Sequence, residues 1–311
     1  MEKARFIKAA ISAVALLLVL GLGVFGISKL ANNKKTPRII ASNFIGYDLA
    51  RATMGDEAAV VMLMKPGSEA HDFEPTPEDI IRIKNADLLI YVGGESDEWI
   101  EGLLHDNEIS EEKTLRLMDY VEAKEEELAD GMEEEVEYDE HIWTSPINTI
   151  KLLDGVRDKI SSIYPERGAS FSDNANLYRE RFLAIDESIR NVVANSSKKE
   201  LIFGDRFPFR YLVDEYGLDY YAAFPGCSEQ TEASSQTIAF LINKAKASDA
   251  KVILKIELTS DKLAQAIADE VGARVMTLNA AHNISQKDFD KGLTYADIME
   301  ENIDVLREAL R

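Results

Sequence analysis

Residues 39–92 decide the fold of this chain, and they read IIASNFIGYDLARATMGDEAAVVMLMKPGSEAHDFEPTPEDIIRIKNADLLIYV. Short aliphatic runs alternate in this stretch with helical patterns, giving predicted strands at 39–42, 59–63 and 88–92 and predicted helices at 47–54 and 78–85. Strands and helices that alternate at this spacing are typical of βαβ units, which place their strands in a parallel sheet. We therefore predict an α/β domain here.

The same alternation returns later in the chain. Strands are predicted at 201–204, 220–222, 252–254 and 274–278, with helices at 209–216, 234–247 and 261–270. Between the two series, apolar residues recur at intervals of three to five positions, at Leu177, Phe182, Ile185, Ile189 and Val192, after a predicted N-cap at Ser172 or Asp173. We predict two α/β lobes, each with a mainly parallel sheet flanked by helices, at 36–165 and 199–311, joined by one long helix at 166–198.

The first 35 residues form a separate segment. Lys3, Arg5 and Lys8 precede an apolar run at 9–27, which approaches the roughly 20 residues needed to span a bilayer. The run is longer than the core of an ordinary signal peptide, and no Ala-x-Ala cleavage site follows it. We predict an uncleaved transmembrane anchor rather than an export signal, with the basic flank in the cytoplasm and the rest outside the cell membrane.

Charge and cysteine content narrow the possible ligands. The formal net charge is −21, which disfavours nucleic acid and anionic membrane surfaces as partners. Much of the acidity lies in residues 122–140, which we predict to be a solvated, mobile loop. Cys227 is the single cysteine, so neither an internal disulfide nor a cysteine-based zinc site is possible within one chain.

Three of the four histidines stand where a metal site is expected. His71 and His282 follow predicted strands, and His141 lies just before a helix that Pro146 opens. Ligands of parallel sheets bind at the carboxyl ends of the strands, and zinc takes about four N, S or O donors. Three histidines and one carboxylate would complete such a site. The ordinary alternative is a surface or hydrogen-bonded histidine, which is how we interpret His105 at a helix end.

Three ordered blocks resemble the metal receptors of ABC importers, a family of zinc and manganese solute-binding proteins. These are Gly67 to Asp79 with its His-Asp-Phe-Glu-Pro-Thr-Pro element, residues 139–146, and Thr294-Tyr295 at the start of a last helix. The resemblance runs from Ile39 to Leu310. It implies two α/β lobes joined by a rigid helix, with the metal in the cleft between them.

The resemblance carries two family ligands directly onto His71 and His141. The family's third ligand falls near Arg206, which stays protonated and cannot bind a metal. We therefore predict Asp205 as its substitute, the alternative being a helix N-cap before Phe207. The fourth falls on Asn279, a weaker donor, so we predict His282 in its place.

Glu257, at the end of a predicted strand, is the reserve carboxylate of this site. Asn279 also stays a possible ligand.

The resemblance implies an extracytoplasmic zinc receptor that delivers its metal to an ABC permease and its ATPase subunit. Manganese is the alternative metal, since fewer histidines and more carboxylates would favour it. A zinc-dependent hydrolase is less well supported, because neither His-Glu-x-x-His nor Gly-x-Ser-x-Gly occurs in the sequence. No feature of the sequence indicates an adhesin. We predict that the protein is not an enzyme.

Overall fold

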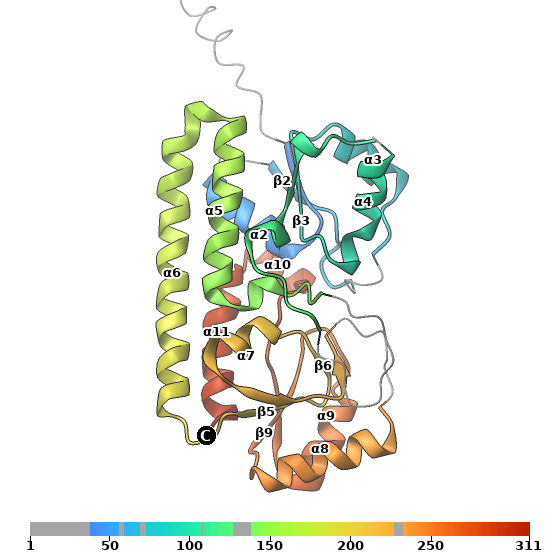
Figure 1. The fold of residues 1–311 in the computed structure, drawn as a ribbon, viewed down its shortest axis with the longest axis vertical. Coiled ribbons are helices and arrows are strands. Elements are labelled where there is room, and N and C mark those ends of the chain that lie inside the picture. Colours follow the sequence, from blue (N-terminus) through green and yellow to red (C-terminus); the bar gives the residue numbers. More distant parts are fainter. Residues whose placement is uncertain (1–37, 56–58, 69–72, 107, 127–137, 227–232) are drawn as a thin grey trace, which may run out of the picture. The chain divides into compact units, whose positions relative to one another are not determined.

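The computed structural model describes residues 38–55, 59–68, 73–106, 108–126, 138–226 and 233–311 (Figure 1). Residues 38–311 form one compact unit. The predicted membrane anchor at 9–27 lies outside the described residues. Within the described ranges, no helix has both the length and the apolar character needed to cross a membrane.

The N-terminal half, residues 38–163, is built on a four-stranded parallel sheet. Its strand order is β2-β1-β3-β4, with β1 Arg38–Ala41, β2 Ala59–Met62, β3 Leu88–Tyr91 and β4 Thr114–Arg116. Every residue of β3 is buried, as expected for a parallel strand covered on both faces. The covering helices are α2 Phe44–Met54, α3 Pro77–Lys84 and α4 Glu98–His105, followed later by α5 Pro146–Ile163. The predicted strands of this half are confirmed.

Short 3₁₀ turns connect these elements, at Glu95–Asp97, Glu111–Lys113, Leu117–Tyr120, Ile142–Thr144 and Pro165–Arg167. Helix α5 begins as predicted, with Pro146 in its first turn and the Ser145 side chain accepting a hydrogen bond from the Asn148 amide at 3.2 Å.

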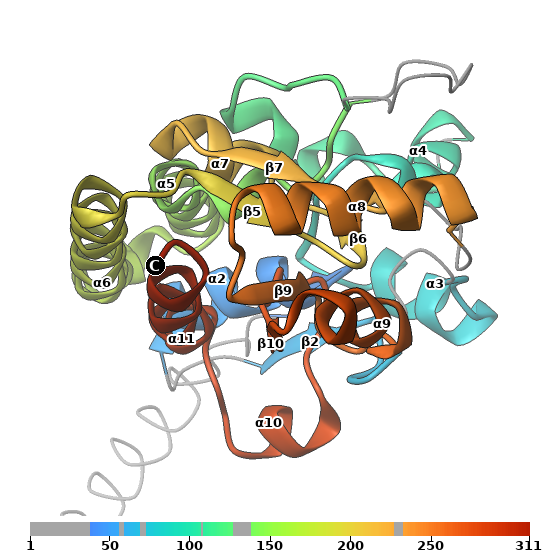
Figure 2. The same ribbon diagram turned by 90° about the horizontal axis from the view of Figure 1, so that it is seen from below.

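The long helix α6, Gly168–Asn195, packs beside α5 and α11, Tyr295–Ala309 (Figures 1 and 2). Its start differs from the prediction, since Ser172 and Asp173 lie inside the helix, and the N-cap residue is Arg167, which makes no side-chain capping hydrogen bond. Leu177 is also not a core residue, because it is 72% exposed while its neighbour Tyr178 is buried. Phe182, Ile185 and Ile189 form the buried stripe.

The C-terminal half, residues 200–311, contains pairs of parallel strands. The pairs are β5 Glu200–Ile202 with β7 Asp219–Tyr221, β6 Arg206–Phe207 with β8 Phe224–Pro225, and β9 Val252–Lys255 with β10 Arg274–Thr277. A parallel bridge between Phe203 and Leu254 connects the first pair to the third. The helices are α7 Arg210–Tyr216, α8 Ser235–Ala247, α9 Lys262–Val271 and α10 Gln286–Asp290. The α/β class with parallel strands is confirmed, while the exact lobe boundaries stay predictions.

Candidate metal centre

His141 lies at the end of the acidic segment, residues 122–140, and is fully buried. Its Nδ1 is 2.8 Å from Asp139 Oδ1, and its backbone amide donates to the same oxygen at 2.7 Å. Because a carboxylate accepts at Nδ1, this nitrogen carries the proton and Nε2 carries the lone pair. Burial lowers the pKa of His141 despite the opposing charge of Asp139, which favours the neutral imidazole that metals bind.

His282 has the same kind of support in the C-terminal half. Its Nδ1 lies 3.1 Å from Glu257 Oε1, and its backbone amide donates to that oxygen at 2.9 Å. The other carboxylate oxygen accepts from the Ala280 amide at 2.8 Å. Burial acts to raise the pKa of Glu257, but the bonds and charge of His282 outweigh it, and the pKa lies below its usual value. Glu257 is therefore held as an anion behind the imidazole.

The loop that carries His282 has a strained backbone. Ala281 has a φ of 59°, in the left-handed region that residues with a side chain seldom adopt. Leu258, which follows Glu257, has a φ of 57°. Such conformations persist only where surrounding contacts hold them, and they concentrate at binding sites.

The two imidazoles meet although 141 and 282 lie on opposite sides of α6 in the sequence. Their ring centroids are 4.5 Å apart and the rings are nearly perpendicular, at 78°. Trp143 packs against both, with ring centroids 5.6 Å from His141 and 6.0 Å from His282. Its indole Nε1 donates to the Ala280 carbonyl at 2.7 Å, and its own carbonyl accepts from Tyr295 Oη at 2.8 Å. Trp143 thus fixes both histidine-bearing segments against each other.

The predicted solvated character of the acidic segment is wrong at its C-terminal end. Asp139 and Glu140 are buried. The end of the acidic segment pairs there with the start of the same segment through a bridge between Glu125 and Tyr138. The Asp139 amide donates to the Lys124 carbonyl at 2.8 Å. This pairing places Glu126 in the one group of three potential metal ligands found among the described residues, with Asp139 and His141, whose ligand atoms lie within 4.8 Å of one another. Sequence reasoning missed Glu126.

Glu140 is a second functional candidate that the sequence did not reveal. Its carboxylate accepts from Ser96 Oγ at 2.5 Å and from the Ser96 amide at 3.1 Å. Burial raises its pKa to about 7, although the Ser96 bond acts in the opposite direction. Together with Asp97 and His282 it lines a cavity of about 10 Å³, enough for roughly one water-sized occupant.

Two of the predicted ligands have other contacts in the structure. Asp205 Oδ2 accepts from the Ile256 amide at 3.1 Å and from Thr259 Oγ1 at 2.5 Å. These bonds hold the turn after β9, and Asp205 is not a helix cap either, since α7 begins at Arg210. Asn279 Oδ1 accepts from the Ala281 amide at 2.8 Å and so shapes the His282 loop.

The remaining histidines are less informative about the site. His71 lies outside the described residues. The side chain of His105 is 89% exposed at the end of α4, in agreement with its interpretation as a surface residue.

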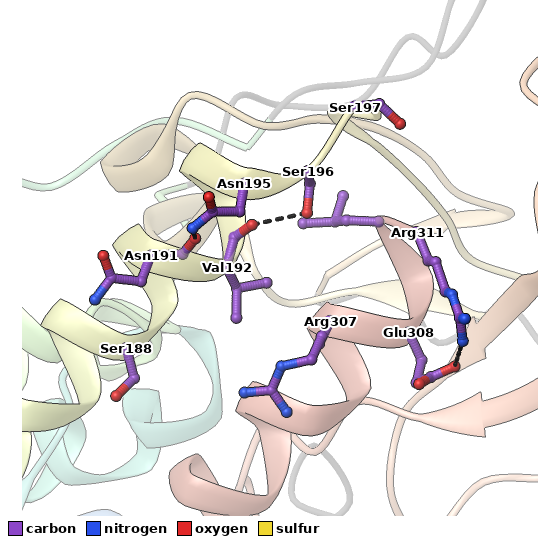
Figure 3. A pocket seen from close by; sticks show the side chains of 10 residues that line it. Ser188, Asn191, Val192, Asn195, Ser196, Ser197, Arg307, Glu308 and Arg311 are labelled. Carbon is purple, nitrogen blue, oxygen red and sulfur yellow. Dashed lines mark hydrogen bonds and ion pairs between the residues drawn. The ribbon is translucent and has the colours of Figure 1, made fainter.

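A second cavity lies at the C-terminal ends of α6 and α11 (Figure 3). It has a volume of about 620 Å³, and residues 188–197 and 307–311 supply its lining. Serine, asparagine and arginine side chains dominate this lining, and its one carboxylate, Glu308, forms ion pairs with Arg274 and Arg311. Arginine and amides are poor metal ligands, so the histidine pair and not this groove is the candidate metal centre.

A parallel α/β architecture that brings two buried, carboxylate-supported imidazoles together suits a metal-binding protein. The family model of ZnuA, described as the periplasmic component A of zinc-uptake complexes, matches residues 39–309. The chain belongs to this family.

Individual relatives agree with this assignment. The chain is 30% identical to the high-affinity zinc uptake system protein ZnuA of Bacillus subtilis, over 96% of this chain and 95% of the relative. It is 28% identical to the zinc-binding lipoprotein AdcA of Streptococcus pneumoniae, over 87% of this chain but only 55% of AdcA. The chain therefore spans about half the length of that relative.

Two solved structures share the fold. The Zn(II)-bound ZnuA-like domain of Streptococcus pneumoniae AdcA superposes with a TM-score of 0.73 at 27% identity, covering 88% of this chain and 99% of the domain. The metal-dependent lipoprotein YcdH of Bacillus subtilis gives 0.75 at 28% identity, covering 89% of this chain and all of YcdH.

Proposed function

We propose that this protein is the extracytoplasmic receptor of an ABC importer and that it captures Zn²⁺ between its two halves. The observation that carries this proposal is the pair of buried imidazoles, His141 and His282, with ring centroids 4.5 Å apart and a carboxylate on each Nδ1. Metal-binding histidines usually donate their second ring nitrogen to a carboxylate or carbonyl in this way. The names of the zinc-binding relatives support the same cargo.

The proposed ligands are the Nε2 atoms of His141 and His282, joined by His71 from the resemblance. Nitrogen ligands favour zinc over manganese, which prefers oxygen. Asp205 and Asn279 stay candidates for the remaining position, although both already hold local backbone turns. We assign Glu257 to orienting His282 rather than to the metal, because its oxygens accept from His282 and Ala280.

Capture follows from the protonation state of the site. The buried neutral imidazole of His141 binds a cation without first losing a proton, and the anions behind the rings offset part of the cation's charge. We propose that His141 and His282 separate during release, since a metal that loses one of its ligands is held less tightly. We propose that a permease with its ATPase subunit receives the ion.

We further propose attachment to the outer face of the cell membrane through residues 9–27, and no enzymatic activity. A hydrolase needs an open coordination position that a substrate can reach. Here His141 is fully buried, and the cavity beside His282 holds about 10 Å³, which leaves no space for a peptide or ester substrate.

The test is metal content and competitive titration with zinc and manganese for the wild type and three variants. We expect one tightly bound zinc per chain, severe weakening in His141→Ala and His282→Ala, and no change in His105→Ala, whose side chain is exposed. Absence of stoichiometric zinc in the wild type would refute the receptor. Tighter binding of manganese than of zinc would identify manganese as the transported metal instead of zinc.

A further inference from the structure

A set of hydrogen bonds crosses between the two halves immediately beside His282. Asn283 Nδ2 donates to the Ser68 carbonyl at 2.7 Å and to the Lys65 carbonyl at 2.8 Å. The Gly67 amide donates in the opposite direction, to the Ile284 carbonyl at 2.7 Å. Asn283 Nδ2 also lies 3.3 Å from Ser68 Oγ. Residues 65–68 belong to the N-terminal half and follow β2, so four hydrogen bonds join residues 283–284 to the other half.

The geometry of Asn283 suits this contact. The side chain is 1% exposed, and its amide nitrogen has two hydrogens for two carbonyl acceptors. Its Oδ1 accepts from the Ile284 amide at 2.8 Å, so the orientation of the amide group is fixed. Gly67 has a φ of 82°, a conformation that glycine adopts readily and that turns the Lys65 and Ser68 carbonyls toward the same donor.

We propose that Asn283 is a positioning residue that latches the two halves together and slows the release of the bound metal. This inference rests on the proposed zinc-receptor function. His282 and Asn283 are adjacent, so a displacement of their backbone that carries His282 away from His141 also pulls Asn283 from the 65–68 turn. Buried hydrogen bonds that lose their partners without gaining water are costly to break, and the latch therefore adds to the barrier for opening.

The test compares Asn283→Asp with Asn174→Asp in the full chain, using zinc as the ligand. Asn283→Asp keeps the size of the side chain but replaces both donors with an oxygen that faces two carbonyls. Asn174 Nδ2 donates to the Thr53 carbonyl at 3.2 Å, between α6 and α2, and provides the same chemical change without contact to residues 283–284. Asn283→Ala removes the donors without adding charge, and serves if the aspartate variant does not fold.

We expect zinc to dissociate at least about tenfold faster from Asn283→Asp, as measured by chelator competition in stopped flow, while the association rate changes little. Hydrogen exchange of the Gly67 amide should accelerate in the zinc-free variant. Asn174→Asp should leave both quantities at wild-type values.

A wild-type protein that binds no zinc would overturn the receptor and the latch together. A wild-type protein that binds zinc, with unchanged release and unchanged Gly67 exchange in both Asn283 variants, would overturn the latch alone. Equal acceleration in Asn283→Asp and Asn174→Asp would also overturn it, because general loss of stability would then explain the effect.

Discussion

Replacing Glu257 by glutamine should weaken zinc binding without removing a ligand. The carboxylate accepts three hydrogen bonds, from His282 Nδ1 at 3.1 Å, the His282 amide at 2.9 Å and the Ala280 amide at 2.8 Å. A glutamine side chain has one oxygen acceptor, so its NH₂ group must face at least one of these donors. The variant therefore loses both the negative charge behind His282 and the fixed orientation of the ring.

The expected magnitude follows from similar outer-shell contacts. Loss of a carboxylate behind a metal-binding histidine typically costs about 10- to 100-fold in metal affinity. Since a factor of ten corresponds to about 1.4 kcal/mol, the binding free energy should weaken by about 1.4–2.8 kcal/mol. A buried N–H left without an acceptor would in addition lower the free energy of unfolding by about 1–3 kcal/mol.

The assay is a competitive zinc titration with a chelator, together with denaturant unfolding of the zinc-free protein. Glu270→Gln is the control, because it makes the same chemical substitution at an exposed position of α9. A change of less than threefold in zinc affinity, in a variant that folds normally, would refute the assignment of Glu257 to orienting His282.

Three further outcomes test the surroundings of the site. Tyr211→Phe removes a hydroxyl that accepts from the Lys124 amide at 3.0 Å and donates to the Asp139 carbonyl at 2.9 Å. Chelator titration should therefore show about 2- to 10-fold weaker zinc binding. The control variant Tyr216→Phe should bind zinc with the affinity of the wild type. Asp205→Ala should lower the free energy of unfolding by about 1–3 kcal/mol in urea while one zinc per chain is retained; loss of the zinc would establish Asp205 as a ligand. Burial raises the pKa of Asp48, so the stabilisation from its proton is present below about pH 3.8 and is lost as the pH rises through the higher pKa of the folded state. Unfolding of the zinc-free protein across this range should therefore show the wild type losing stability relative to Asp48→Asn, and parallel curves would contradict this.

The sequence predicted the elements more successfully than their contacts. The runs at 39–42, 59–63 and 88–92 correspond to β1, β2 and β3 within a residue, because continuous apolar runs between turn residues are a local signal. Leu177 was misassigned to the core because the helical period allows its neighbour Tyr178 on the buried face equally well.

Local sequence patterns could not predict which residues hydrogen-bond to the histidines and their neighbours. Glu257 and His282 are 25 residues apart, and Asn283 and Lys65 are 218 residues apart, so their pairing depends on the complete fold. Asp139 and Glu140 share the composition of the acidic segment, which indicates solvent exposure. Only the pairing of Glu125 with Tyr138 and the contact of Ser96 with Glu140 explain why they are buried.

Helix α6 offers a practical reference for spectroscopy. Its exposed residues Asp173 and Ala194 are separated by about 32 Å at 1.5 Å per residue. Cys227 is the single native cysteine, so its replacement would allow two labels to be placed at these positions without competing reaction. That pair would serve as an internal ruler, against which distance changes between labels on the two halves can be calibrated during metal loading.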